Sequence, residues 1–385
     1  MMTTLREQLT VIVPTCNRPE RLLRVLRYYS ASRCPAPMRV LDSSTTPLDA
    51  RALEPFVARG ADVAVLSYPA TVLPLAKMLN GLERVSTPYA VIWADDDFLV
   101  PGAFEEGVRL LGGYPDISVV HGQSGLFRMD AAQIQWVAPY PQRAILDETA
   151  SARLQNHFRQ CSVMFYSIAR TEALRKNFEQ ICRLGLDWHT WGELALGGLA
   201  VIQGKAYLMD RLYMMREAHG GMFSATIHAV RSIDAFDWLV DPAVSRELGS
   251  YEMFRDCLVP ELVRQDRLNA ASAREAIKQA FWPYLVAQME AKWRGPVVRR
   301  NSAMAARLRN TATQVPGLRR AWRAVRSRLP DQAFSLEALR RRSSPYHAHF
   351  MAVYRALIDA HEQMQRDEPN TEERWVEEHP VCARD

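Results

Sequence analysis

The sequence predicts an α/β fold in which a mostly parallel sheet carries helices on both faces, followed by a mainly helical C-terminal region. Two observations support the sheet. Over the first 125 residues, short apolar runs alternate with segments whose apolar residues recur at helical spacing. The first run, Leu9–Pro14, is almost wholly apolar, as expected for a strand buried on both faces. Strands separated by helices need crossover connections, which favour parallel neighbours.

A helix is expected after each of the first four strands. Asn17 can cap the first helix, with Pro19 in its first turn. Further helices are expected over residues 49–59, over Thr71–Val85 and after Pro101. The five expected strands are Leu9–Pro14, Met38–Asp42, Asp62–Tyr68, Pro88–Ala94 and Ile117–His121.

The alternation changes beyond Gly125. Cys161–Tyr166 and Ala200–Leu212 are expected to add strands to the sheet, with either parallel or antiparallel orientation open. Asp187–Leu196 is expected to form a short helix. This part of the chain therefore predicts an extension of the first sheet and not a second, separate one.

From Asp237 onward the apolar pattern is helical, as in Tyr251–Val263 and Ala270–Met289. A chain of 385 residues is long for one domain. We therefore expect a first domain over 1–235 and a helical region over 236–385.

Composition excludes several classes of protein. With 48% hydrophobic and 24% charged residues, the chain is neither mainly disordered nor a small disulfide scaffold. Its six cysteines form no CxxC pair, so we expect neither a zinc site nor a disulfide framework. This use of cysteine is typical of a protein of the reducing cytosol. The short apolar run after Glu7 does not have the length of a signal peptide. No uncharged apolar stretch reaches about 18 residues, so we expect no membrane span.

The net charge of +5 conceals a strong asymmetry. Residues 291–330 carry eleven Lys or Arg and no acid, whereas the tail over 361–385 is acidic. Apolar residues such as Trp293 and Trp322 are interleaved with the basic ones, a pattern that suits an anionic membrane surface. The alternative is a solvated helical face, or one that pairs with the acidic tail. Nucleic acid is the less favoured partner.

Three consecutive acids, Asp95, Asp96 and Asp97, directly follow the fourth expected strand. Adjacent carboxylates repel one another unless a cation neutralises them. Hard oxygen ligands suit Mn²⁺ or Mg²⁺, which in turn hold phosphates. The alternative is a solvated turn whose acids favour the N-terminus of the next helix. Because ligand sites of parallel sheets lie at the carboxyl ends of the strands, we favour a metal site.

Polar residues also follow the first two strands. The first strand leads into a helix start that can receive a nucleotide or phosphate, or be an ordinary cap. Asp42, at the end of the second strand, can accept hydrogen bonds from a base or ribose, or belong to a turn. Lys77 can face a diphosphate, or be exposed. The candidate residues after the first strand are Pro14, Thr15, Asn17 and Arg18.

Together these segments resemble a known family. The order VIVPTCNRPERL, VLDSSTT, LAKMLNGL and YAVIWADDDFLVPGAF resembles the family 2 glycosyltransferases, which have the GT-A fold. DWHTWGELALGG at 187–198 and LYMMREAHGG at 212–221 resemble that family's acceptor-side helix and a later element with arginine and histidine. The resemblance spans residues 9–221.

The resemblance implies roles for particular residues on the donor side. Asp42 matches the acid that holds the base or ribose, and Asp95 and Asp96 match the stretch that touches ribose and metal. Asp97 matches the closing acid of the DxD element, and His219 matches a histidine that completes the metal site in some relatives. The implied ligands of Mn²⁺ or Mg²⁺ are Asp97, Asp95 and His219.

The resemblance also implies roles on the acceptor side. Asp187 matches an acid that acts as catalytic base, and Glu193 is the second candidate because Leu186 replaces the acid that usually precedes it. Three aromatic residues are candidates for a sugar platform, although helical spacing also allows Trp191 to be a core residue. These candidates are Trp188, His189 and Trp191.

The activity implied is metal-dependent, inverting transfer from a nucleoside-diphosphate sugar, with a UDP-sugar favoured. The acceptor would be a saccharide or lipid-linked saccharide, as in bacterial surface-polysaccharide synthesis. The enzyme would be cytoplasmic, or peripheral on the inner face of the membrane. A retaining transferase, a nucleotidyltransferase and a non-catalytic binding protein on a degenerate transferase domain remain alternatives.

Overall fold

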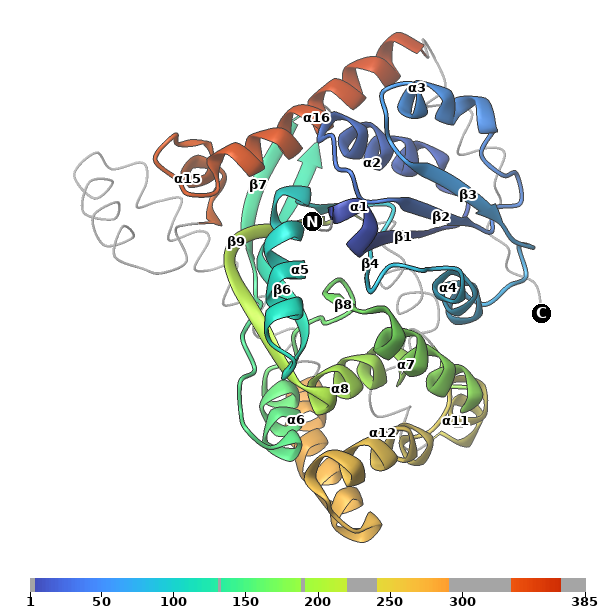
Figure 1. Cartoon of the computed structure of the whole chain (residues 1–385), viewed down its shortest axis with the longest axis vertical. Helices are drawn as coiled ribbons and strands as arrows, with labels where there is room; N and C mark the ends of the chain where they lie inside the picture. Colours follow the sequence, from blue (N-terminus) through green and yellow to red (C-terminus); the bar gives the residue numbers. More distant parts are fainter. Residues whose placement is uncertain (1–3, 131–132, 188–190, 220–240, 291–333, 368–385) are drawn as a thin grey trace.

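The computed structural model describes residues 4–130, 133–187, 191–219, 241–290 and 334–367. Within these ranges the strands form a nine-stranded mixed sheet in the order β3-β2-β1-β4-β8-β6-β9-β5, with β7 paired to β6. Figure 1 shows helices on both faces of this sheet. The predicted α/β class is therefore confirmed. The strands are β1 Leu9–Thr15, β2 Met38–Asp42, β3 Val63–Ser67, β4 Tyr89–Ile92, β5 Phe98–Leu99, β6 Ile117–Asp130, β7 Gln133–Tyr140, β8 Ile168–Arg170 and β9 Lys205–Glu217.

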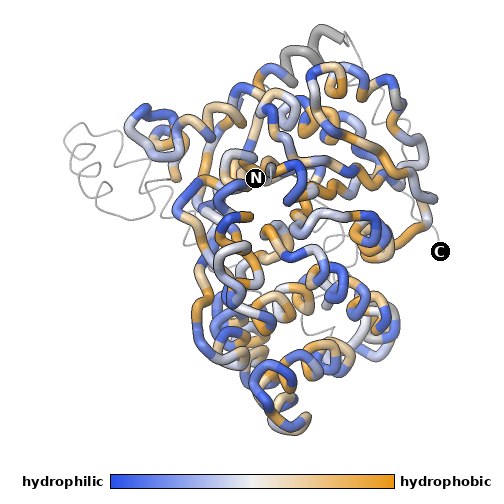
Figure 2. Tube along the Cα trace, in the orientation of Figure 1, coloured by the Kyte–Doolittle hydropathy of each residue, from blue (hydrophilic) through white to orange (hydrophobic). Residues whose placement is uncertain are grey.

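The first half of the sheet is parallel, as its crossover connections require. β1 pairs with β2 on one side and with β4 on the other, and β2 pairs with β3, all in parallel. In this register Thr15 lies opposite Asp42, so β1 and β2 end at the same edge. Figure 2 shows that these central strands are mostly hydrophobic. Polar side chains after the strands therefore gather at one edge of a buried sheet.

A helix or a short 3₁₀ turn follows each of the first four predicted strands, as expected, and the structure adds helices that were not predicted. The expected helix over Thr71–Val85 is α4, which begins only at Pro74 because proline suits the first turn of a helix. Within the described residues up to Gln203 the helices and 3₁₀ turns are α1 Leu5–Gln8, α2 Pro19–Ala31, η1 Ala50–Leu53, α3 Glu54–Val57, α4 Pro74–Glu83, η2 Pro101–Ala103, α5 Phe104–Gly113, α6 Ala150–Arg159, α7 Thr171–Arg183 and α8 Glu193–Gln203.

Asn17 does not cap α2, contrary to expectation. The N-cap residue is Arg18, and its side chain makes no capping hydrogen bond. Asn17 instead adopts φ 53° in the left-handed region, which asparagine tolerates better than most residues. Its side-chain oxygen accepts a hydrogen bond from the Thr45 backbone N–H at 2.9 Å. Asn17 therefore ties the loop after β1 to the loop after β2.

Two strand predictions were wrong in detail. Cys161–Tyr166 is a loop, and the strand that enters the sheet, β8, follows it between β4 and β6. The first part of Ala200–Leu212 is the end of α8, and β9 begins at Lys205. Every residue from Leu194 to Ile202 is buried, so this helix lacks the polar face that distinguishes a helix from a buried strand.

The helical region packs against the sheet domain in two separate places. α11 (Pro242–Leu248), α12 (Tyr251–Asp266) and a helix over residues 270–290 form one group, in which α12 contacts α6 and α8. α15 (Leu336–Arg340) and α16 (His347–Asp367) form the other, beside α2 at the opposite end of the molecule (Figure 1). The predicted boundary at 235 and the basic stretch 291–330 lie outside the described residues, as does the acidic tail beyond 367. Among the described helices, none has the length and apolar character needed to span a bilayer.

A buried histidine of α6 makes the stability of the protein depend on pH. His157 is 1% exposed and its ring lies against Phe158, with 4.9 Å between ring centroids. Burial lowers the pKa of His157 to about 4. In the unfolded chain the ring is protonated below its ordinary pKa of 6.5, whereas in the folded protein it stays neutral down to about pH 4. The free energy of unfolding therefore falls as pH falls from about 6.5 to about 4.

We therefore expect His157→Gln to flatten the acid side of the stability profile. Between pH 7 and pH 4 the wild-type protein should lose roughly 3 kcal/mol more than the variant, the equivalent of the lowered pKa. Urea unfolding at several pH values measures this difference. Parallel profiles for the two proteins would contradict it, whatever their offset.

Candidate active site

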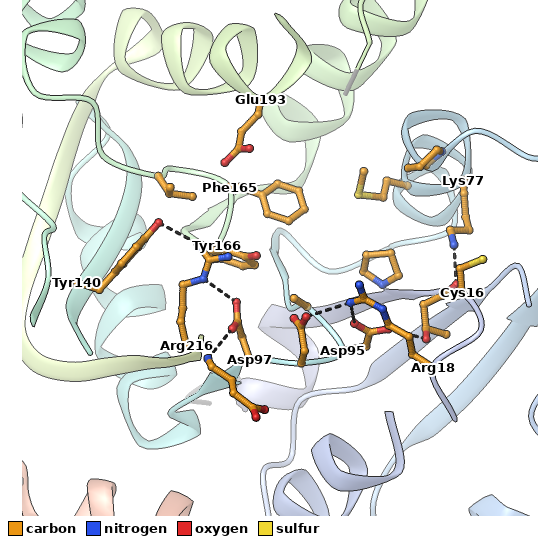
Figure 3. Close-up of a pocket in the computed structure, with 18 residues that line it drawn as sticks. Cys16, Arg18, Lys77, Asp95, Asp97, Tyr140, Phe165, Tyr166, Glu193 and Arg216 are labelled. Atoms are coloured by element: carbon orange, nitrogen blue, oxygen red, sulfur yellow. Dashed lines mark hydrogen bonds and ion pairs between the residues drawn. The ribbon is translucent and has the colours of Figure 1, made fainter. Parts of the chain in front are cut away.

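A cavity of about 460 Å³ lies at the carboxyl ends of β1 and β4. Loops after these strands form one wall, and β7, β9 and the start of α8 form the other (Figure 3). Its lining combines acidic, basic and aromatic side chains from distant parts of the sequence. The lining residues are Pro14, Thr15, Cys16, Arg18, Pro74, Lys77, Met78, Ala94, Asp95, Asp96, Asp97, Tyr140, Val163, Phe165, Tyr166, Glu193, Arg216 and Glu217.

Asp95 and Asp96 share one cationic partner. The Arg18 Nη1 atom lies 3.3 Å from Asp95 Oδ1 and 3.0 Å from Asp96 Oδ2. Asp95 Oδ2 accepts a hydrogen bond from the Thr15 hydroxyl at 2.8 Å. His219 Nε2 lies 3.2 Å from Asp96 Oδ2. The loop after β1 thus holds both carboxylates at the floor of the cavity.

Asp97 faces the opposite wall and has partners of its own. Its Oδ2 forms an ion pair of 3.0 Å with Arg216 Nε of β9, and its Oδ1 accepts the Glu217 backbone N–H at 3.2 Å. The Arg216 guanidinium also donates to the Tyr140 hydroxyl at 2.8 Å and lies over the ring of Tyr166. The third aspartate therefore joins the end of β4 to β9.

Burial perturbs the acids of the cavity. It raises the pKa of Asp95 to about 6 and that of Asp97 to about 7, with Asp96 adding repulsion at both. Burial opposes the charge of Asp96 too, but a hydrogen bond from His219 and the charge of Arg18 lower the pKa of Asp96 overall. Burial raises the pKa of Glu193, which Arg216 partly offsets.

Lys77 is buried, and its ammonium group forms hydrogen bonds with two loops. Its Nζ donates to the Thr15 carbonyl at 2.7 Å and to the Ser43 hydroxyl at 2.6 Å. Burial lowers its pKa, and nearby Asp42 partly opposes this. Asp42 accepts the Ser44 and Leu48 backbone N–H groups at 2.8 and 3.0 Å. The structure therefore uses both residues to shape the loops after β1 and β2.

Most of the predicted donor-side residues line the cavity, whereas Glu193 is the one acceptor-side candidate among the described residues that does. Asp187 and Asn17 lie outside its lining, whereas Glu193 lines it. Trp191 is fully buried against Phe254 and Phe281 in the helical region, so the sugar-platform prediction for it was wrong and the core alternative is correct. The predicted partners Trp188 and His189 lie outside the described residues.

Sequence reasoning missed the aromatic wall and the arginine behind it. Tyr140, Phe165 and Tyr166 come from β7 and from the loop before β8, where no motif marks them. Arg216 was inside a quoted segment, LYMMREAHGG, but had no assigned role. The signal in the sequence was a charged residue directly after the apolar run Leu212–Met215, because a charge at the end of a buried strand requires a partner.

The donor atoms suit a hard divalent ion only in part. In the ranges that the structure describes, no three His, Cys, Asp or Glu side chains converge enough to ligate one ion. The predicted set of Asp95, Asp97 and His219 is therefore not brought together as a preformed cage. However, Asp95 and Asp96 already hold a cation, the Arg18 guanidinium, between them. One or two carboxylates, with substrate phosphates as further ligands, are what Mg²⁺ requires.

Comparisons with known proteins identify the fold. No family model matches the sequence, and no curated protein sequence matches it. The structure is similar to S. aureus TarS residues 1–349 in complex with UDP-GlcNAc, with a TM-score of 0.51 and 12% identity, over 94% of this chain and 93% of that one. The chain has the GT-A fold.

A second solved structure is similar over a smaller part of the chain. Glucosyl-3-phosphoglycerate synthase from Mycobacterium tuberculosis, in complex with Mn²⁺, UDP and glucosyl-3-phosphoglycerate, matches 63% of this chain and 81% of its own. Its TM-score is 0.36 at 15% identity. In the GT-A chain described here, the cavity lies where this fold class places its ligands, at the carboxyl edge of the parallel strands.

Proposed function

We propose that the chain is a metal-dependent, inverting glycosyltransferase of the family 2 type that uses a nucleoside-diphosphate sugar. The observation that carries the proposal is a single cavity that joins the Asp95–Asp97 cluster to the carboxylate of Glu193. A donor site and a candidate base thus share one space, as transfer between two bound substrates requires. The GT-A fold supports this function, and the UDP-GlcNAc in the TarS structure supports a UDP-sugar as donor.

The donor would lie over the loops after β1 and β4. Thr15, Arg18, Asp95 and Asp96 provide the polar groups there, and Lys77 keeps the first loop in place. Asp95 and Asp96 would hold Mn²⁺ or Mg²⁺ together with the diphosphate. When bound, the ion would neutralise the diphosphate leaving group as a Lewis acid.

Glu193 is the better candidate for the catalytic base. It lines the cavity and Figure 3 shows it projecting from α8 toward the aromatic residues there, whereas Asp187 lies outside the lining. In the reaction, an acceptor hydroxyl attacks the anomeric carbon from the face opposite the diphosphate. The bond from that carbon to the diphosphate oxygen breaks, and Glu193 takes the hydroxyl proton. A carboxyl whose pKa is raised by burial is suited to this step near neutral pH.

The acceptor is proposed to be a saccharide or lipid-linked saccharide, as in surface-polysaccharide synthesis. The aromatic wall of Tyr140, Phe165 and Tyr166 supports a sugar ring as the group that is bound beside Glu193. The charge of residues 291–330 supports contact with an anionic membrane surface on the cytoplasmic side.

Nucleotide-dependent stabilisation tests the proposal directly. We expect UDP with Mn²⁺ to raise the melting temperature more than GDP, CDP, CMP or dTDP, and EDTA to reduce the effect. A ligand at about 100 times its Kd adds roughly 2.7 kcal/mol, which a melting curve resolves. No shift with any nucleotide, with or without metal, would argue for a non-catalytic protein on this fold.

A further inference from the structure

Arg18 occupies the place between Asp95 and Asp96 where a divalent ion would neutralise both carboxylates. One atom, Nη1, is within 3.3 Å of both side chains. The two carboxylates are almost completely buried, with side-chain exposures of 7% and 12%, whereas that of Arg18 is 22%. Two adjacent buried carboxylates stay ionised together only when a cation lies close to both of them. In this structure the Arg18 guanidinium is that cation.

The position of Arg18 also gives it access to an incoming ligand. It lines the cavity, and it follows Asn17, whose backbone N–H donates to the Ser44 hydroxyl at 2.8 Å. The backbone is therefore fixed, while the side chain reaches its partners through a long aliphatic stem. A guanidinium pairs with phosphate as well as with carboxylate, through two parallel hydrogen bonds.

The charges of the cavity make an exchange necessary if a diphosphate enters. Five acids line it, Asp95, Asp96, Asp97, Glu193 and Glu217, against the three bases Arg18, Lys77 and Arg216. Lys77 is committed to two loop oxygens and Arg216 to Asp97. Arg18 instead pairs with the two aspartates that a divalent ion would also neutralise, so an incoming ion can release it toward a phosphate while taking its place between the carboxylates.

We propose that Arg18 is an internal counterion that competes with a divalent cation for Asp95 and Asp96, and that transfers to the diphosphate when the donor binds. This rests on the proposed function for the identity of the ligand. Its consequence is that metal and nucleotide bind cooperatively. Metal alone must displace Arg18, whereas metal with nucleotide gives Arg18 a new partner. The coupling is reciprocal, so each ligand tightens the binding of the other.

The test is a titration of Mn²⁺ into the nucleotide-free full-length protein, followed by calorimetry or by the EPR signal of free Mn²⁺. Arg18→Gln should lower the Kd for Mn²⁺ by about tenfold or more, because the competing charge is removed. Arg18→Lys keeps the charge and should give an intermediate Kd. Arg39→Gln is the matched control, since it removes the same charge at the start of β2, where Arg39 pairs with Asp62 at 2.9 Å and lies outside the lining of the cavity. Its Kd should stay within about twofold of wild type.

UDP binding in the presence of saturating Mn²⁺ provides the second readout. Arg18→Gln should weaken UDP by about tenfold while it tightens Mn²⁺, and a merely structural defect would weaken both. Unchanged or weaker Mn²⁺ binding by Arg18→Gln, or an equal gain in Arg39→Gln, would overturn the proposal. If Arg18→Gln fails to fold, Arg18→Lys becomes the test variant. A Kd for Mn²⁺ equal to that of wild type would then contradict the proposal. If the wild-type protein binds no nucleotide, the proposed function is refuted. The comparison of Mn²⁺ affinity between wild type and Arg18→Gln still tests whether Arg18 competes with the ion.

Discussion

Glu193→Gln is expected to reduce sugar transfer by about 10²–10⁴-fold, the usual contribution of a general base. The amide is nearly the same size as the carboxylate but cannot take the proton of the acceptor hydroxyl. UDP affinity should remain within about twofold, because the donor contacts lie on the opposite wall. The measurement is UDP release from the UDP-sugar whose nucleotide stabilises the protein, with water or added saccharide as acceptor.

Asp187→Asn is the comparison that decides between the two candidate bases. It should retain most of the activity, since Asp187 lies outside the lining of the cavity. In the wild-type protein the rate should rise with pH through a range above that of an ordinary glutamate, because burial raises the pKa of Glu193. A full loss of activity in Asp187→Asn, with Glu193→Gln still active, would reverse the assignment.

Arg216→Met is expected to lower the free energy of unfolding by about 3–5 kcal/mol, because it leaves the Asp97 carboxylate buried without its cation. The Asp97 side chain is 2% exposed, so water cannot replace the lost partner. The variant also removes the donor to the Tyr140 hydroxyl. Urea unfolding at pH 8 measures the loss.

The double variant Asp97→Asn with Arg216→Met is the control for this prediction. Removing both charges should restore part of the stability lost in the single variant, which gives a coupling energy between the two residues. The loss should also be smaller at pH 5 than at pH 8. Burial raises the pKa of Asp97 to about 7, so protonation favours the folded state below that value and this contribution disappears as pH rises through it. A loss below about 1 kcal/mol at pH 8 would show that water compensates the carboxylate.

Local patterns were sufficient for the parallel half of the sheet. β1, β2 and β4 are short, apolar and bounded by polar or proline residues, so their positions and the place of Asp95–Asp97 follow from the sequence. The pattern failed at α8, where Leu194–Ile202 is buried all round and cannot be distinguished from a strand by periodicity. β8 was missed because three residues in a strand carry too little pattern to detect.

Part of the candidate site could likewise be predicted from the sequence, and part of it could not. Sequence alone determined that three acids and the start of the first helix lie at the carboxyl edge of a parallel sheet, since parallel strand direction follows from crossover connections. Only the tertiary structure decided that Glu193 lines the cavity while Trp191 belongs to the core, and that Asp97 pairs with Arg216. The physical reason is that these contacts join residues far apart in the chain. The direction in which these side chains point depends on how α8 and β9 pack against the rest of the fold. That packing cannot be predicted from the local periodicity of the sequence.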